Sequence, residues 1–369
     1  MALVLSSGRI SDCHRRWSTR MAKPTEPARR VSLHAVAAQA QVAVSTVSRF
    51  LNGSLQLTRE TEERVVRAMQ EVGYEASGRS ARPSARPRGV LALIVPQIGN
   101  PYFSRIADRF VSAVESSGYQ ALIASTSSHA RKQNDYVDML REHGIGGLVY
   151  VGNFSSNAAL SALIATGLPV VLLDEALASD PPVDAVLVDD YSGGYQATAY
   201  LASLGHRHIA LLTGPAALRS VQERRRGWTD ALTRADIDLT AQLEVNGSFT
   251  EDFGTAALTR LLSADPAPTA VFAASDTIAL GLMTGARNLS VRIPEDLSVV
   301  GFDDIPAASY VHPRLTTVRT PLDAMSDSAV TVLIDRIEHP DRKPCTSITP
   351  VTLIVGGTTS SRLLTTGRD

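Results

Sequence analysis

The sequence predicts a small all-α head of the helix-turn-helix type, followed by an α/β body of two lobes, each a doubly wound parallel sheet. Apolar residues recur with helical spacing in three short segments between residues 31 and 76. From residue 90, short apolar runs alternate with longer helical patterns, which is typical of buried parallel sheets. These units are too many for one compact sheet, so we expect two lobes.

Charge is unevenly distributed along the 369 residues. Residues 1–88 hold 15 Lys and Arg against 7 Asp and Glu, and the rest of the chain holds 21 against 30. A basic head favours an anionic partner, nucleic acid first, although a solvated tail is the alternative for residues 1–30. Two cysteines, Cys13 and Cys345, fit a reducing cytoplasm. The sequence contains neither a membrane-length apolar run nor a secretory signal, so we expect a cytoplasmic protein.

The N-terminal part divides into an extension and a head. Residues 1–30 show no hydrophobic periodicity, so we expect a disordered basic extension with its start at Met1 or Met21. The head, residues 31–76, contains three helices in which Thr58 caps the third helix and Gly73 ends it. The apolar positions of the three helices are Leu33, Val36, Ala37 and Ala40, then Val44, Val47 and Leu51, then Val65, Ala68, Met69 and Val72. A tight connection between the first two helices indicates a helix-turn-helix motif.

The second helix of the head carries DNA-binding chemistry between its apolar positions. Ser45, Thr46 and Ser48 are short hydroxyl side chains that allow close approach to phosphates. Arg49 has the guanidinium that binds guanine bidentately in the major groove. The alternative is a small three-helix bundle with a polar face, and the pattern favours DNA binding.

The head resembles the lactose-repressor (LacI/GalR) family of bacterial transcription regulators. The family's leading pattern is matched by Val36, Ala37, Ala40, Val42, Thr46, Val47, Ser48, Arg49, Leu51 and Asn52, and a later one by Thr61, Arg64, Val65, Gly73 and Tyr74. The resemblance implies that Val44, Ser45 and Arg49 read base edges, whereas Thr46, Ser48 and Asn52 hold phosphates. Gln41 replaces the family's turn glycine and Ala43 replaces its capping serine, and a lost cap costs about 1 kcal/mol.

Residues 77–88 are expected to be a linker rich in Ser, Pro and Arg. In the family this segment forms a short hinge helix that wedges a leucine into the minor groove. Pro83 stands at the leucine position, and proline removes a donor and clashes inside a short helix, so we do not expect a standard hinge helix. Two interpretations remain: a flexible basic linker, or arginines that track phosphates or lie in a narrow minor groove. These arginines are Arg79, Arg82, Arg86 and Arg88.

The body, residues 89–369, alternates strands and helices. Strands are predicted over 90–95, 119–124, 147–151, 169–173, 185–188, 208–213, 270–274, 297–302 and 347–355. Helices are predicted near 103–117, 131–142, 157–166, 193–204, 221–234, 252–263, 278–288 and 322–338. The resemblance implies a periplasmic-binding-protein-like (type I) body for effector binding and dimerisation. It also implies crossings between the lobes near 188–191 and 317–321, and again in the segment leading to helix 322–338.

Polar and aromatic residues collect after the predicted strands, where ligands bind open α/β sheets. The set joins aromatic rings, carboxylates and one arginine, which suits a polyhydroxylated ring. The family's effector pocket is implied for Tyr102, Phe103, Asp174, Ser220, Arg224, Phe249, Ser275 and Asp303. The rings of Phe103 and Phe249 have a core position as their alternative, and Asp276 and Asp304 are preferred as helix N-caps or inter-lobe hydrogen-bonding groups.

Together these features favour a sequence-specific transcription regulator, a repressor, that binds double-stranded operator DNA as a homodimer or higher oligomer. Its expected effector is a sugar or sugar derivative, with a purine-like corepressor as the alternative. A solute-binding protein lacks the export signal it would need, and an enzyme of sugar metabolism lacks a nucleophile or cofactor motif. We expect no catalytic residues, cofactor, metal or membrane partner: acidic pairs such as Asp189-Asp190 define no acid/base geometry, and His206 and His208 are expected to be structural.

Overall fold

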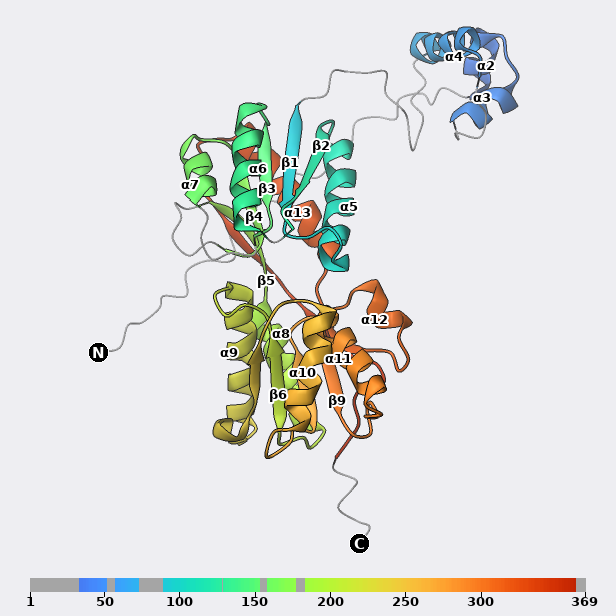
Figure 1. Cartoon of the computed structure of the whole chain (residues 1–369). Helices are drawn as coiled ribbons and strands as arrows, with labels where there is room; N and C mark the ends of the chain where they lie inside the picture. Colours follow the sequence, from blue (N-terminus) through green and yellow to red (C-terminus); the bar gives the residue numbers. More distant parts are fainter. Residues whose placement is uncertain are drawn as a thin grey trace. The chain divides into compact units, whose positions relative to one another are not determined.

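The chain divides into two compact units, residues Met1–Ala85 and Arg86–Asp369. The computed structural model describes residues 33–51, 57–72, 89–127, 129–152, 158–176 and 183–362 (Figure 1). The expected basic extension 1–30 and linker 77–88 lie outside these ranges, as do Asn52, Gly73 and Tyr74. No helix in the described part is long and apolar enough to cross a membrane.

The head contains three helices, α2 (Leu33–Ala40), α3 (Val44–Leu51) and α4 (Arg59–Val72). Their inner faces form one small core, each member at most 3% exposed: Val36, Ala37, Ala40, Val47, Val65 and Ala68. These residues stand at the predicted helical spacing. The predicted all-α helix-turn-helix head is therefore confirmed.

The turn between α2 and α3 has a left-handed residue where the sequence departs from the family pattern. Gln41 has φ 54°, and the next N–H, from Val42, bonds the Ala37 carbonyl at 3.0 Å. Left-handed backbone costs a non-glycine residue about 1–2 kcal/mol. Ala43 precedes α3 and its methyl group accepts no hydrogen bond, so both sequence departures weaken the start of this helix.

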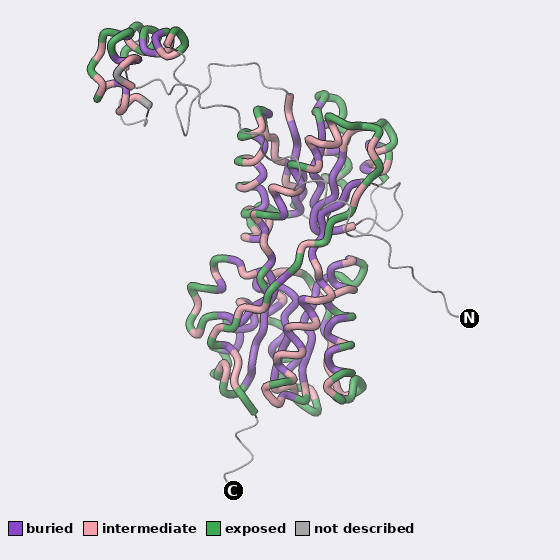
Figure 2. Tube along the Cα trace, turned by 180° about the vertical axis from the view of Figure 1, so that it is seen from behind, coloured by how far each residue is buried: buried purple, intermediate pink, exposed green. Residues whose placement is uncertain are grey.

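The first lobe of the body is a six-stranded, wholly parallel sheet in the order β11-β5-β4-β3-β1-β2. Its strands are β1 (Val90–Val95), β2 (Gln120–Ser125), β3 (Gly147–Tyr150), β4 (Val170–Asp174), β5 (Asp184–Val188) and β11 (Thr346–Thr349). Helices α5 (Pro101–Ser116) and α13 (Leu322–Glu338) pack together on one face, and α6 (Ala130–Glu142) and α7 (Ala158–Ala165) on the other. Buried residues follow the strands between these helix layers (Figure 2).

The second lobe repeats this architecture with the order β12-β10-β9-β8-β6-β7, in which only β12 is antiparallel. Its strands are β6 (Ile209–Thr213), β7 (Glu244–Asn246), β8 (Ala270–Ala273), β9 (Ser298–Asp303), β10 (Thr316–Arg319) and β12 (Thr352–Ile354). Its helices are α8 (Asp190–Ser203), α9 (Arg219–Arg234), α10 (Glu251–Leu262), α11 (Asp276–Asn288) and the short α12 (Pro306–Tyr310), with a 3-10 turn, η1, at Leu239–Ala241. The prediction of two doubly wound lobes is confirmed.

The chain passes between the lobes three times, after β5, after β10 and after β11. The third passage differs from the expectation, because it follows β11 and does not belong to the segment before helix 322–338. The single strand predicted over 347–355 is also wrong: β11 lies in the first sheet and β12 in the second. Pro350 separates them, and its missing N–H interrupts a strand's hydrogen-bond ladder.

Helices α8 and α9 approach each other at backbone distance. A Cβ on Gly194 would lie 2.3 Å from the Arg224 carbonyl oxygen, and one on Gly227 would lie 2.2 Å from the Tyr191 carbonyl oxygen. Only glycine therefore fits at these two positions. The close packing brings Arg224 of α9 beside the first turn of α8.

Candidate functional site

The outer face of α3 is the candidate DNA-reading surface of the head. Ser45 is exposed, whereas Thr46 and Ser48 are half-buried. Val47 is buried in the head core, and half-buried Val44 packs against that core. Arg49 lies within α3, but its side chain, like all of Asn52, is outside the described part of the structure. Ser45 is therefore the most exposed of the three hydroxyl residues, whereas Thr46 and Ser48 flank the buried Val47.

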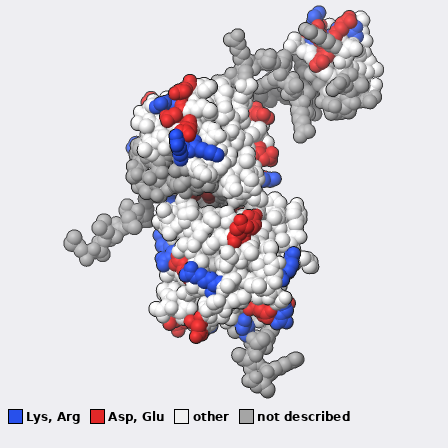
Figure 3. Space-filling view, viewed as in Figure 1, with Lys and Arg blue, Asp and Glu red and all other residues white. Residues whose placement is uncertain are grey.

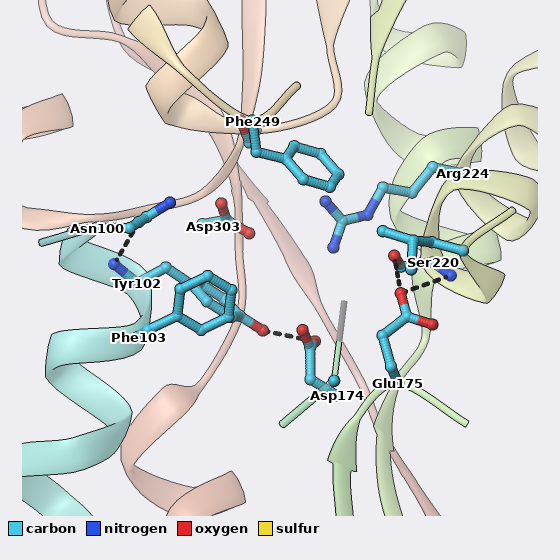
Figure 4. Close-up of a pocket in the computed structure, with 12 residues that line it drawn as sticks. Asn100, Tyr102, Phe103, Asp174, Glu175, Ser220, Arg224, Phe249 and Asp303 are labelled. Carbon is cyan, nitrogen blue, oxygen red and sulfur yellow. Dashed lines mark hydrogen bonds between the residues drawn. The ribbon is translucent and has the colours of Figure 1, made fainter. Parts of the chain in front are cut away.

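A single pocket gathers all eight body residues that the sequence nominated (Figure 4). Asn100, Gly152, Glu175 and Leu218 complete its lining, and it encloses about 470 Å³ including its opening to solvent. Each lobe contributes, since α5 and β4 belong to the first, and α9, α11 and β9 to the second. The pocket therefore lies at the carboxyl ends of strands of both sheets, where the rule for open α/β sheets places ligands.

Arg224 is the buried cation of this pocket, and the protein holds it on three sides. Its Nε donates to Asp190 Oδ1 at 2.8 Å, its Nη1 donates to the Ala274 carbonyl at 2.5 Å, and its guanidinium carbon lies 3.7 Å from the centre of the Phe302 ring. Burial lowers the pKa of Arg224, but the carboxylates of Asp190 and Asp303 outweigh burial and raise it. The side chain is therefore a fixed cation with donors left for a ligand.

Two aspartates at strand ends supply acceptors. Asp174 accepts the Tyr102 hydroxyl at 2.6 Å, and burial together with Asp190 raises the pKa of Asp174 to about 6. Burial also raises the pKa of Asp303 well above its usual range, against the opposing charge of Arg224. No described residue donates a hydrogen bond to the Asp303 carboxylate, so its acceptor capacity is open to the pocket.

The backbone at both aspartates is unusual. Asp174 has φ 75° and Asp303 has φ 113°, a region that side-chain-bearing residues rarely adopt. Such strain persists only where the surrounding structure fixes it, and it clusters at functional sites. The two carboxylates are thus held in place at an energetic cost.

Glu175 is a pocket residue that the sequence did not nominate. It follows β4 in the first lobe and accepts hydrogen bonds from the first turn of α9 in the second: from the backbone N–H groups of Arg219 and Ser220, each at 3.1 Å, and from the Ser220 hydroxyl. Burial and the neighbouring Asp174 raise the pKa of Glu175 to about 7. Glu175 stands at the same strand end as Asp174, so the strand-end rule indicated this place, but its partners are distant in sequence and belong to the other lobe.

Comparison with known proteins gives matches over both the head and the body. "Bacterial regulatory proteins, lacI family" matches residues 32–77, and "Periplasmic binding protein-like domain" matches residues 198–359. The HTH-type transcriptional regulator MalR of Streptomyces coelicolor is 33% identical over 335 residues, covering 88% of this chain and 96% of MalR. The chain belongs to the lacI family of bacterial regulatory proteins.

Two further similarities cover most of this lacI-family chain. The HTH-type transcriptional repressor PurR of Vibrio vulnificus is 33% identical over 311 residues, which cover 83% of this chain and 93% of PurR. The solved complex of the transcriptional regulator CelR with cellobiose has a TM-score of 0.68 and 31% identity, and it covers 89% of this chain and all of that one. Head and body are thus matched together, in a regulator.

The expectations for Asp276 and Asp304 need correction in this lacI-family body. Ser275 caps α11 by accepting the Ile278 N–H at 3.2 Å, whereas buried Asp276 accepts the Thr317 hydroxyl at 2.5 Å and the Ile305 N–H at 2.9 Å. Asp304 pairs with Arg319 at 2.6 Å. Neither aspartate is an N-cap or bridges the lobes, because all their partners belong to the second lobe.

Of the remaining candidates, His206 has a structural role and Asp190 holds the pocket arginine. His206 is buried, with its ring nitrogens bonded to Thr269 and Ser298, so its expected structural role is confirmed. Asp190, which the sequence offered only as half of an acidic pair, is fully buried and binds both Arg224 and Arg219. It fixes the pocket's cation without lining the pocket.

Proposed function

We propose that this regulator is a repressor whose affinity for operator DNA is controlled by a sugar or sugar derivative bound between the two lobes. One observation carries the proposal: the eight nominated residues, drawn from both lobes, line one pocket. A ligand there touches both lobes together and therefore favours one relative placement of them.

The lining chemistry supports a polyhydroxylated ring. The carboxylates of Asp174 and Asp303 accept hydrogen bonds from hydroxyls, and Arg224 donates to them. Phe103 and Phe249 offer apolar faces for the C–H side of a ring. The similar CelR structure contains cellobiose, which agrees with this class of ligand.

The head supplies the DNA-binding half of the proposal. We propose residues 31–76 as the DNA-binding domain, 77–88 as the linker and 89–369 as the effector-binding and dimerisation domain. Ser45, Thr46, Ser48 and Asn52 would contact phosphates or base edges beside Val44, and Arg49 would read guanine. Charges of both signs are interspersed on the face of the body in Figure 3.

The proposed assembly is a homodimer in the cytoplasm. Two copies of the head would occupy two half-sites of a pseudo-palindromic operator. An effector that changes the placement of the lobes would change the spacing of the heads. The effect of the effector on DNA affinity is a coupling free energy between the pocket and the DNA-binding site. DNA must therefore change the affinity for the effector by the same factor as the effector changes the affinity for DNA.

A thermal-shift screen of the full chain tests the effector assignment. The panel contains uncharged pentoses, hexoses and disaccharides together with nucleobases. We expect one sugar to raise the melting temperature, since a ligand at 100 times its Kd adds about 2.7 kcal/mol to stability. Asp303→Asn should abolish the rise, because it removes a carboxylate that lines the pocket.

The matched control is Asp304→Asn, which changes the adjacent aspartate outside the pocket and should keep the rise. A panel in which no sugar stabilises the protein would overturn the proposal. So would a rise that survives in Asp303→Asn. Stabilisation by nucleobases alone would instead establish the purine-like corepressor.

A further inference from the structure

The first turn of α9 opens into the effector pocket as a set of anion-binding donors. Leu218, Ser220 and Arg224 of this region line the pocket, and Leu218 at the N-cap position provides no capping side chain. The first N–H groups of a helix have no partner within the helix, and the helix dipole adds positive potential there. Such a helix end is suited to bind a phosphate or carboxylate group.

In this protein a carboxylate of the chain itself occupies that position. Both Glu175 carboxylate oxygens are engaged. One accepts from the Arg219 N–H, and the other accepts from the Ser220 N–H and hydroxyl (Figure 4). Glu175 is 5% exposed and Ser220 is 4% exposed, so the contact is closed to solvent. The carboxylate comes from the first lobe and the helix from the second, so the contact also joins the two sides of the pocket.

The remaining charges of the described pocket disfavour an anionic ligand. Asp174, Glu175 and Asp303 face it, against the single lining cation, Arg224. That cation is already paired with Asp190, and so is Arg219, whose other nitrogen donates to the Val188 carbonyl at 3.1 Å. A second anion would enter a site whose carboxylates outnumber its cations.

Glu175 is also costly to keep ionised at this position. Burial and the nearby Asp174 raise the pKa of Glu175 to about 7, so its environment opposes the charge despite three hydrogen bonds. A requirement for stability alone would be met more cheaply by a neutral capping side chain.

We propose that Glu175 is a specificity-determining residue, an internal carboxylate that fills the anion site of the pocket and restricts the effector to sugars without a phosphate or carboxylate group. The inference rests on the proposed function in one respect, namely that the effector is a sugar. The occupied anion site itself is independent of it, because the site is defined by Glu175 and α9 alone.

The test asks whether removal of Glu175 creates an anion site. Sodium sulfate and sodium phosphate are titrated calorimetrically into the full-length wild type and Glu175→Ala at pH 8, with ionic strength held constant by sodium chloride. We expect a saturable isotherm with one ion per chain in Glu175→Ala and none in the wild type. A rise in melting temperature with sulfate should accompany it in the variant alone.

The matched control is Glu223→Ala, which removes a carboxylate from the same helix outside the pocket, where Glu223 pairs with Arg226 at 2.7 Å. It should bind neither ion. Equal binding by Glu223→Ala, or no saturable binding by Glu175→Ala, would overturn the proposal. If Glu175→Ala fails to fold, Glu175→Ser vacates the same position with a short polar side chain, and stabilisation of this variant by sulfate beyond the wild type is then the deciding result.

A second arm measures the effector class directly. Any sugar that stabilises the wild type is compared with its phosphorylated form, and the phosphorylated form should bind only after Glu175 is replaced. Tighter binding of the phosphorylated form by the wild type would contradict the role of Glu175. Failure of every sugar, together with a gain of sulfate binding in Glu175→Ala, would refute the proposed sugar effector and leave the filled anion site established.

Discussion

At the scale of single residues, Arg224 is prepared before any ligand arrives. Its contacts with Asp190, Ala274 and Phe302 fix the guanidinium, and burial of the aliphatic stem removes its remaining freedom. A side chain that is already ordered loses little entropy on binding. The pocket therefore offers a ligand a hydrogen-bond donor, Arg224, that is already held in position.

The raised pKa of Glu175 predicts a pH-dependent stability that one substitution removes. Between pH 4.5 and about 7 the folded protein holds a proton on Glu175 that the unfolded chain releases, so the free energy of unfolding falls as pH rises. Relative to Glu175→Gln, the wild type should lose at most about 3 kcal/mol across this window. Urea unfolding of both proteins from pH 4.5 to 8 measures the difference.

The Glu223→Ala variant serves as control here too, because this glutamate lies outside the pocket. Its unfolding free energy should follow the wild-type pH dependence. A constant difference between the wild type and Glu175→Gln over the whole range would show that the carboxyl titrates normally.

Pocket residues were predictable where one strand or one helix places them. Asp174 and Asp303 follow apolar runs, and the rule that ligands bind beyond strand ends found them directly. Glu175 and Asp190 were not found, because their roles depend on partners 44 and 34 residues away along the chain. Their environment is created by tertiary packing, and sequence spacing does not report it.

At the scale of elements, α3 combines a fully buried anchor, Val47, with exposed or half-buried hydroxyls around it. Its beginning is weakly specified, because Gln41 is left-handed and Ala43 cannot cap. The helix depends on packing against α2 and α4 for its stability, as short helices generally do.

The recognition role of α3 predicts a selective effect of Arg49→Ala. Operator affinity should fall by about 1–3 kcal/mol and base preference should relax at one position of each half-site. The measurement is fluorescence anisotropy with DNA that the protein selects from a random library. Arg67→Ala, an exposed arginine on α4, is the matched control and should change affinity little. Unchanged operator affinity and base preference in Arg49→Ala would refute the assignment of α3 as the recognition helix.

Elements were predictable in proportion to their apolar content. Strands such as β1, with the sequence VLALIV, were found within a residue. The strands β7 and β10 were missed, since each has one apolar residue, and in β10 the buried hydroxyl of Thr317 bonds Asp276. The split of 347–355 into two strands has two causes. Pro350 can be read from the sequence, but the free sheet edge that each half joins depends on the tertiary structure.

At the scale of the whole molecule, the proposed function links two binding events, one in the pocket of the body and one at the head. The chain crosses between the lobes three times, and the pocket takes residues from both sides. A ligand in the pocket shifts the equilibrium between two arrangements of the lobes only as far as it binds one arrangement more tightly than the other. Control of DNA binding therefore requires that the sugar prefer one arrangement.

The affinity of the full chain for its selected DNA, with and without the stabilising sugar, tests this account most directly. We predict a change of at least about fivefold, and an equal change in sugar affinity when DNA is present. Asp303→Asn should bind DNA as tightly as the wild type and show no response to the sugar. Equal DNA affinity with the pocket empty and saturated would contradict the account.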